Sequence, residues 1–234
     1  MGIVLGARLS AVADMLGAFH TVADIGADHG RLAVALLQTG LAARAIASDI
    51  SDKSLDKARE LAAACNMESR LSVRTADGLS GLAKNEADAL VIAGMGGALI
   101  ARILADSPEV AQNAERIMMQ PMRGTAELRY YLHHNGFRIL DERIAFEAGR
   151  YYQLIAARFG EPEAIPENFP EGVYKFGWVM AQKRDKNLLP LLRRYRAGHV
   201  KRLEKAQRAG VVPETLVKEL DQLDALMRFT EECP

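Results

Sequence analysis

The chain has 234 residues, enough for one α/β domain and a smaller appendage. Its 30 basic residues balance its 30 acidic residues, so no global positive field points to nucleic acid. No apolar run approaches the roughly 18 residues of a membrane-spanning helix, and the N-terminus lacks a signal-peptide pattern. The two cysteines, Cys65 and Cys233, match no metal-binding spacing. We therefore expect a cytoplasmic protein with reduced thiols, no membrane partner and no bound metal.

Short apolar runs alternate with amphipathic stretches along the first two thirds of the chain. A lead-in helix is expected over residues 7–18, where apolar positions recur at helical spacing. Strands are expected over 22–25, 45–50, 71–75, 89–93 and 116–120, and helices over about 31–38, 51–65 and 125–134. Two more strands, 137–143 and 151–159, leave no room for a helix between them and suit an antiparallel hairpin. This alternation predicts an α/β fold, a Rossmann-like, mostly parallel sheet.

The composition changes after Gly160. Residues 161–172 hold three prolines and four glutamates and are typical of a linker. Residues 174–208 then carry eleven Lys or Arg against two acids. Leucines at spacings of three and four on both sides of Gly210 and Pro213 predict an antiparallel, coiled-coil-like helical hairpin. We expect two domains, 1–160 and 161–234, and the basic helix either contacts nucleic-acid phosphates or is only a solvated face.

A buried strand at 22–25 runs into a glycine turn and then a helix, the arrangement with which α/β sheets bind nucleotides. Gly26 and Gly30 let the backbone turn sharply. Asp28 stands where the dinucleotide fingerprint has its second glycine, and a carboxylate there repels a pyrophosphate. Asp24 and Asp28 instead favour a cationic or hydroxyl-rich ligand. The pattern favours S-adenosylmethionine (SAM) over NAD, the alternative being a loop that only closes the corner.

Acidic residues also end the next two strands. Asp49 follows Asp24 by 25 residues and is placed to bind ribose hydroxyls, or to cap the helix that begins near Ser51. Asp77 and Gly78 end the third strand, where a carboxylate can accept a hydrogen bond from an adenine amine or can belong to a simple turn. The joint pattern of three acids at three successive strand ends supports a nucleoside-binding edge.

A glycine-rich loop, Gly94-Met95-Gly96-Gly97, follows the fourth and most apolar strand. Enzymes that methylate an exocyclic adenine amine often carry Asn/Asp-Pro-Pro-aromatic here, and this chain does not. The glycines allow close approach of a methyl group or a flat base, and they also suit a tight turn before a helix. His29, beside Asp28, is open to a catalytic or a structural reading.

Four motifs together resemble one family: Asp-Ile-Gly-Ala-Asp-His-Gly at 24–30, Asp-Gly-Leu at 77–79, Ile-Ala-Gly-Met-Gly-Gly-Ala-Leu-Ile at 92–100 and Met-Gln-Pro at 119–121. They are similar to the bacterial tRNA adenine-N1 methyltransferases that act on adenine 22. The resemblance spans nearly the whole chain and implies a class I SAM-dependent fold and a tRNA substrate. The expected cofactor-binding residues are Asp24, Ile25, Gly26, Asp49, Ile50, Asp77, Gly78, Gly94 and Met95.

Three functions are compatible with these patterns. The first is transfer of a methyl group from SAM to adenine N1 in tRNA, with Asp28 and then His29 as catalytic residues that stabilise the cationic product. The second is a SAM enzyme with a small-molecule substrate, whose helical hairpin is a dimerisation arm. The third is a non-catalytic RNA-binding module. We expect a monomer or a weak dimer.

Overall fold

The computed structural model describes residues 2–165, 167, 169 and 172–232; Cys233 therefore lies outside the described residues. The chain divides into two compact units, Met1–Glu163 and Ala164–Pro234, which are described separately. The separate roles expected for residues 1–160 and 161–234 stay predictions.

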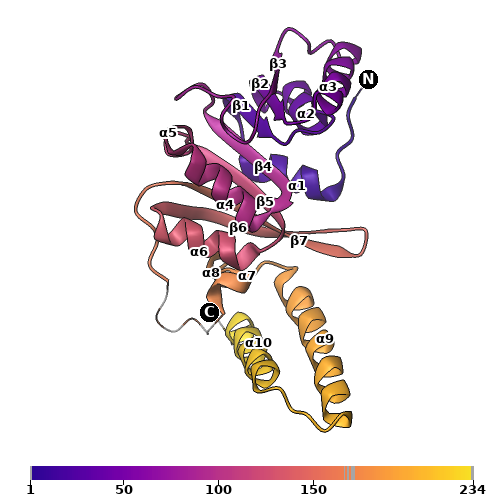
Figure 1. Cartoon of the computed structure of the whole chain (residues 1–234), viewed down its shortest axis with the longest axis vertical. Helices are drawn as coiled ribbons and strands as arrows, with labels where there is room; N and C mark the ends of the chain where they lie inside the picture. The colour runs from indigo at the N-terminus through magenta and orange to yellow at the C-terminus, as the bar shows by residue number, and fades with distance from the viewer. Residues whose placement is uncertain (1, 166, 168, 170–171, 233–234) are drawn as a thin grey trace. The chain divides into compact units, whose positions relative to one another are not determined.

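The first unit is built on one seven-stranded sheet with the order β3-β2-β1-β4-β5-β7-β6 (Figure 1). The strands are β1 (Phe19–Ile25), β2 (Ala42–Asp49), β3 (Leu71–Thr75), β4 (Ala89–Gly96), β5 (Arg116–Arg123), β6 (Phe137–Glu147) and β7 (Arg150–Phe159). The helices are α1 (Ala7–Leu16), α2 (Arg31–Thr39), α3 (Asp52–Ala64), α4 (Gly97–Asp106), α5 (Pro108–Ala111) and α6 (Thr125–His134). The first five strands are parallel, whereas β7 is antiparallel to both β5 and β6. The predicted Rossmann-like sheet with a terminal hairpin is confirmed.

The central strands are apolar because both of their faces are covered. Val22 in β1 and Val91 in β4 are fully buried, and they pack in one cluster with Leu16 of α1 and Leu36 of α2. Burying each such side chain contributes about 1.5–3 kcal/mol. This packing fixes the strands and therefore the turns that follow them.

Parallel strands place all their carboxyl ends at one edge of the sheet. The turns after β1, β2, β3 and β4 therefore meet at the same edge, together with the end of β5. Since β6 is antiparallel to β7, and β7 to β5, β6 also ends at this edge. The β6–β7 hairpin projects past the other strands (Figure 1).

The crossover from β3 to β4 departs from the usual strand–helix alternation. Residues 76–88 form turns and contain no α-helix. In a doubly wound sheet each crossover helix covers part of a face. Here a hollow remains on the sheet over the beginnings of β1, β2 and β3, and it is lined by Arg44, Arg74 and Glu86 among others.

The second unit contains α7 (Val173–Phe176), α8 (Trp178–Gln182), α9 (Leu188–Arg208) and α10 (Glu214–Glu232). Pro190 lies in the first turn of α9, where its missing N–H breaks no helical hydrogen bond. Arg193 pairs with Glu231 and Arg196 with Asp224, so the numbers rise along α9 as they fall along α10. The predicted antiparallel helical hairpin is confirmed.

Candidate functional site

The turn after β1 needs glycine at position 26 for two reasons. Gly26 has φ +71°, a conformation that L side chains rarely adopt, and a Cβ here would overlap the terminal methyl group of Met95. The Gly26 N–H donates to the carbonyl of Ser48 at 2.7 Å, which ties the turn to β2. The loop predicted over residues 94–97 is instead the end of β4 and the first residue of α4. The turn after β1 therefore meets the end of β4 directly.

A cavity of about 270 Å³ opens between this turn and the end of β4. The predicted residues that line it are Asp24, Gly26, Asp28, His29 and Gly94. The structure thus brings together five residues that lie as far as 70 positions apart in the sequence. Met95 joins them through its contact with Gly26.

Asp24 is the buried acid of the cavity, with only 5% of its surface exposed. Burial raises the pKa of its carboxyl group to about 7, a hydrogen bond with the Ala33 backbone opposes this, and the charge of Asp49 adds to it. Among the described residues no basic side chain pairs with Asp24. A buried acid without a counter-charge is suited to a cationic ligand, which would restore its ionised form.

Asp49 ties two turns together. Its Oδ2 accepts a hydrogen bond from the Asp28 N–H at 3.0 Å, and its Oδ1 accepts one from the Ser51 N–H at 2.9 Å. The cap of α3 is Ser51, whose hydroxyl accepts from the Ser54 N–H at 3.3 Å. Asp49 therefore does not cap the helix itself, and each carboxylate oxygen keeps capacity for a further hydrogen bond.

The two predicted isoleucines differ in what they can offer. Ile25 is only 1% exposed, so its side chain belongs to the core and only its backbone can face a ligand. Ile50 is 73% exposed at the carboxyl edge. An apolar side chain held in water at this edge can cover one face of a flat ring.

Asp28 and His29 are exposed at the rim of the cavity. Asp28 has φ +49°, which aspartate tolerates better than most residues. His29 Nε2 lies 3.4 Å from Asp28 Oδ1 and 3.1 Å from Lys57 Nζ. Both side chains can reach a ligand in the cavity, and their catalytic role stays a prediction.

Asp77 and Gly78 lie apart from this cavity. They line a separate pocket of about 190 Å³ with Arg102 and Asp106. The Asp77 carbonyl accepts a hydrogen bond from the Ser80 N–H at 3.2 Å. This bond is typical of a turn, which was the alternative interpretation of Asp77. The structure does not place these two residues in one pocket with Asp24, and their role toward an adenine stays a prediction.

Arg8 and Gln120 were not among the predicted site residues, although Gln120 belongs to the Met-Gln-Pro motif at 119–121. Arg8 of α1 lines the same cavity as Asp24, and its Nη1 donates to the Oε1 of Gln120 at 2.6 Å. Gln120 is fully buried, and its amide nitrogen donates to the Pro121 carbonyl at 2.9 Å. A glutamine at the end of an apolar strand was the available signal for Gln120, whereas nothing in the local sequence distinguishes Arg8.

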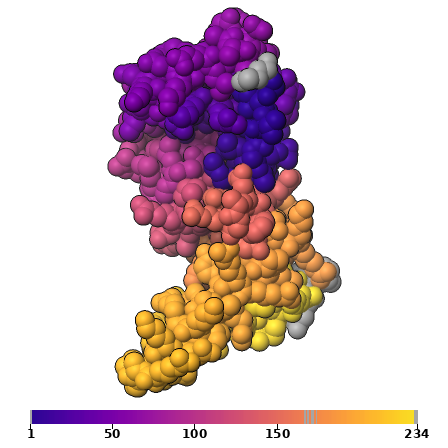
Figure 2. All heavy atoms as spheres, turned by 90° about the vertical axis from the view of Figure 1, so that its right-hand side faces the viewer, coloured from indigo at the N-terminus to yellow at the C-terminus, as the bar shows by residue number. Residues whose placement is uncertain are grey.

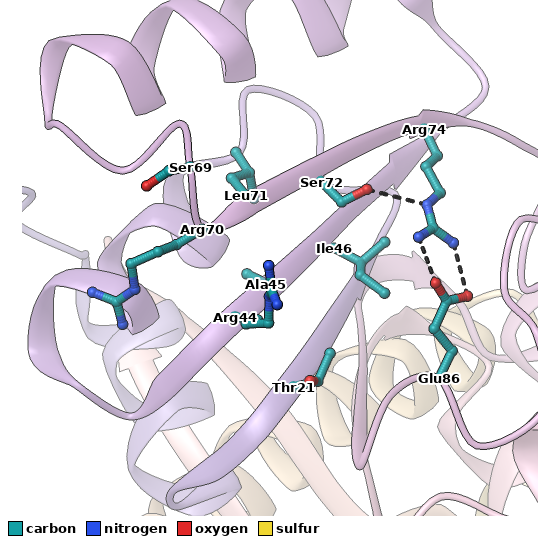
Figure 3. Close-up of a pocket in the computed structure, with 10 residues that line it drawn as sticks. All are labelled: Thr21, Arg44, Ala45, Ile46, Ser69, Arg70, Leu71, Ser72, Arg74 and Glu86. Carbon is teal, nitrogen blue, oxygen red and sulfur yellow. Dashed lines mark hydrogen bonds and ion pairs between the residues drawn. The ribbon is translucent and has the colours of Figure 1, made fainter.

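The hollow over the starts of β1, β2 and β3 has a volume of about 350 Å³ and is not at the carboxyl edge (Figure 3). Arg74 donates to both carboxylate oxygens of Glu86, at 2.8 and 2.5 Å, and lowers the pKa of Glu86 to about 2. Arg70 donates to the carbonyls of Ala42 and Ala43 at 2.7 and 2.8 Å. Arg70 and Arg74 therefore use their guanidinium groups in contacts within the protein, and we assign no cofactor to this hollow.

The described part of the chain contains no group of three His, Cys, Asp or Glu side chains placed to hold a metal ion. None of its helices is both long and apolar enough to cross a membrane.

Comparison with known proteins now identifies the class. A family model described as a methyltransferase domain matches residues 5–155, which is more than half of the chain. The fold and the site therefore define a methyltransferase with a Rossmann-like sheet.

Individual relatives narrow the class. The chain is 36% identical to the tRNA (adenine(22)-N(1))-methyltransferase of Bacillus subtilis over 68% of this chain and 67% of that protein. The crystal structure of the B. subtilis M1A22 tRNA methyltransferase TrmK is 28% identical, with a TM-score of 0.78 and 99% of both chains covered. Streptococcus pneumoniae Sp1610 in complex with S-adenosyl-L-methionine is 26% identical, with a TM-score of 0.84 over 96% of this chain and 100% of that one. This chain belongs to the family of bacterial tRNA (adenine-22, N1)-methyltransferases.

Proposed function

We propose that this protein transfers a methyl group from SAM to N1 of adenine 22 in tRNA. The observation that carries the proposal is the cavity at the carboxyl edge, where Asp24 is buried without a basic partner and Gly26 meets Met95 at the end of β4. The B. subtilis relative is named for this reaction, and the S. pneumoniae relative was crystallised with SAM.

The residues at this edge fit SAM. SAM carries positive charge and no phosphate, and a turn with acids at 24 and 28 suits such a ligand better than a pyrophosphate. Asp24, with Ile25 and Gly26, would hold the cationic part of the cofactor, and Asp49, with Ile50, the ribose hydroxyls. Asp77 and Gly78 would hold the adenine, and Gly94 and Met95 would lie against the reactive end. A dinucleotide would need a glycine at position 28 for the close approach of its pyrophosphate, and this chain has aspartate there.

The chemistry needs alignment more than acid–base catalysis. SAM supplies an electrophilic methyl group bonded to a positive sulfur atom. Adenine N1 has a free lone pair, so no proton must be removed before the new N–C bond forms and the C–S bond breaks. The methylated base is cationic, and the exposed carboxylate of Asp28 can stabilise its developing charge, with His29 as the second group.

The tRNA substrate gives a role to the basic helix. α9 carries basic residues, such as Lys201 and Arg202, that pair with no acid among the described residues, and these would neutralise backbone phosphates. A protein that acts on tRNA is expected in the cytoplasm. We propose a monomer or a weak dimer, since one copy contributes every residue assigned to the site.

Incubation of the protein with methyl-labelled SAM and bulk bacterial tRNA tests the proposal. We expect label in tRNA, recovered after digestion as 1-methyladenosine. Stabilisation of the protein by SAM without transfer to tRNA would favour a small-molecule substrate. No stabilisation by SAM and no transfer would favour a non-catalytic RNA-binding module.

A further inference from the structure

Two aromatic side chains lie at the tip of the β6–β7 hairpin. Phe146 and Tyr151 are register partners on adjacent strands, and their ring centroids lie 4.7 Å apart with the planes tilted by 42°. Phe146 is 49% exposed. An aromatic pair at the end of a projecting hairpin contributes little to the core and presents flat apolar surface to a partner.

The hairpin tip is connected to the wall of the cofactor cavity. Glu147, the residue after Phe146, accepts a hydrogen bond from the Arg8 N–H at 3.2 Å. The Arg8 guanidinium lies 5.7 Å from the ring centroid of Tyr152, the residue after Tyr151. Figure 2 shows the surface of the hairpin beside the N-terminal segment, in agreement with these contacts.

The two faces of the tip are therefore used differently. Side chains alternate between faces along a strand, and register partners share a face. Tyr152 and Glu147 face α1 and hold Arg8 at the cavity. Phe146 and Tyr151 lie on the opposite face, where Phe146 remains half exposed.

Other exposed groups at the same edge indicate the chemistry of a partner. Leu99, in the first turn of α4, is 37% exposed. Arg123, the last residue of β5, is exposed as well. Flat apolar surface beside positive charge fits a nucleic acid, which offers bases for stacking and phosphates for the cations.

We propose that Phe146, supported by Tyr151, is a stacking platform for an unpaired base of tRNA next to the target adenine. The inference rests on the proposed function and adds a binding surface to it. N1 lies on the pairing edge of adenine, so the target base must leave its pair and its stack to reach the cavity. A neighbouring base then loses a stacking partner, and an aromatic ring at the same edge of the sheet can replace it.

Steady-state kinetics and tRNA binding of the full-length protein test the platform. Phe146→Leu removes the ring and keeps an apolar side chain, and Phe146→Trp keeps a ring. We expect Phe146→Leu to raise both the KM and the Kd for tRNA about tenfold, because stacking on one ring contributes roughly five- to hundredfold in affinity. Phe146→Trp should stay close to wild type, and SAM affinity should be unchanged in both variants.

Phe159→Leu is the matched control. Phe159 lies at the other end of β7, is 42% exposed and also contacts a second aromatic ring, that of Phe137. It should leave the KM for tRNA within about twofold of wild type, since one-ring stacking accounts for a larger change. Tyr151→Leu, a second variant of the platform, should act in the same direction as Phe146→Leu.

The outcomes separate this inference from the proposed function. Wild-type KM and Kd in Phe146→Leu, or an equal loss in Phe159→Leu, would overturn the platform while the methyltransferase activity stands. A wild-type protein that does not methylate tRNA would overturn the proposed function. In that case, the tRNA Kd values of the same variants still decide whether Phe146 contacts RNA.

Discussion

The acids at the strand ends of the first unit and the basic residues of α9 in the second differ in whether they form ion pairs within the protein. Asp24 and Asp49 pair with no basic side chain of the described chain; Asp49 instead accepts hydrogen bonds from two backbone amides. On α9, Arg193, Arg196 and His199 contact acids of α10. The acids at the strand ends remain available to a ligand, whereas part of the basic charge of α9 is already used.

Part of the basic charge of α9 is paired because the neighbouring helix α10 is acidic. α10 carries six acidic residues against Lys218 and Arg228, so it offsets much of the positive charge counted along α9. Arg196 donates to Asp224 at 2.5 Å and lowers the pKa of that carboxyl group. A charge count along one helix therefore overstates the charge that a tRNA would meet.

Removal of residues 161–234 should have the largest effect, because it deletes all the basic residues of α9 and none of the strand-end acids. We expect SAM affinity to be retained, because every predicted SAM contact precedes residue 97, and tRNA methylation to collapse. Loss of several phosphate contacts reduces affinity on the order of a hundred- to a thousandfold. SAM titration, tRNA binding and molecular mass should be measured on the shortened protein. Full tRNA affinity in a protein that has become monomeric would show that the hairpin is a dimerisation arm instead.

Asp49→Ala tests the acids at the strand ends. We expect SAM affinity to fall about ten- to a hundredfold, because a charge-assisted pair of hydrogen bonds contributes roughly 1.5–3 kcal/mol. The melting temperature should also fall by a few degrees, since the Asp28 and Ser51 amides lose their acceptor. Asp56→Ala, which removes an exposed acid from α3, is the control. Unchanged SAM affinity in Asp49→Ala, measured by calorimetric titration, would contradict the ribose assignment.

We expect the buried Asp24 to make SAM binding depend on pH. The pKa of its carboxyl group is raised from 3.8 to about 7 in the folded protein. Between these pH values the folded protein therefore keeps a proton on Asp24 that the unfolded chain has lost. The contribution of Asp24 therefore lowers the stability of the free protein as pH rises from about 4 to 7. A cationic ligand favours the ionised carboxylate, so SAM affinity should rise about tenfold between pH 6 and pH 8. Titrations across this range should show that dependence in the wild type and a flat profile in Asp24→Asn; a flat wild-type profile would contradict it.

Two single substitutions on α9, one at an unpaired arginine and one at a paired arginine, should have the smallest effect. Arg202 is exposed and has no partner among the described residues, whereas Arg193 lies 3.4 Å from Glu231. Arg202→Gln should reduce the slope of log affinity against log salt by about one for tRNA. Arg193→Gln should leave this slope nearly unchanged. Equal effects of the two variants would show that the ion pair does not withhold charge from tRNA.

The sequence was sufficient for features that local residue types determine. Apolar runs between polar turns predicted the strands, and glycine at 26 beside acids at 24 and 28 predicted the turn that lines the cavity. Parallel strand ends share an edge by geometry alone, so the acids that end β1 and β2 were expected at one edge, where Asp49 accepts a hydrogen bond from the Asp28 N–H.

Features that depend on distant partners could not be predicted. Arg8 reaches Gln120 across 112 positions, and neither residue marks the other in the sequence. Asp77 follows a strand as Asp24 does, yet it lies in a separate pocket with Arg102, because side-chain surroundings and not strand order decide which cavity a residue lines. The exposure of Phe146 likewise follows from the length of the hairpin relative to its neighbours.

Methyl transfer to two tRNA transcripts that differ only at nucleotide 22 tests the central claim most directly. One transcript carries adenine at this position and the other carries guanine, whose N1 bears a proton and has no free lone pair. We expect one labelled methyl group per adenine-22 transcript, at N1, and none on the guanine-22 transcript. Equal transfer to both transcripts, or no transfer to either by a protein that binds SAM, would contradict the account.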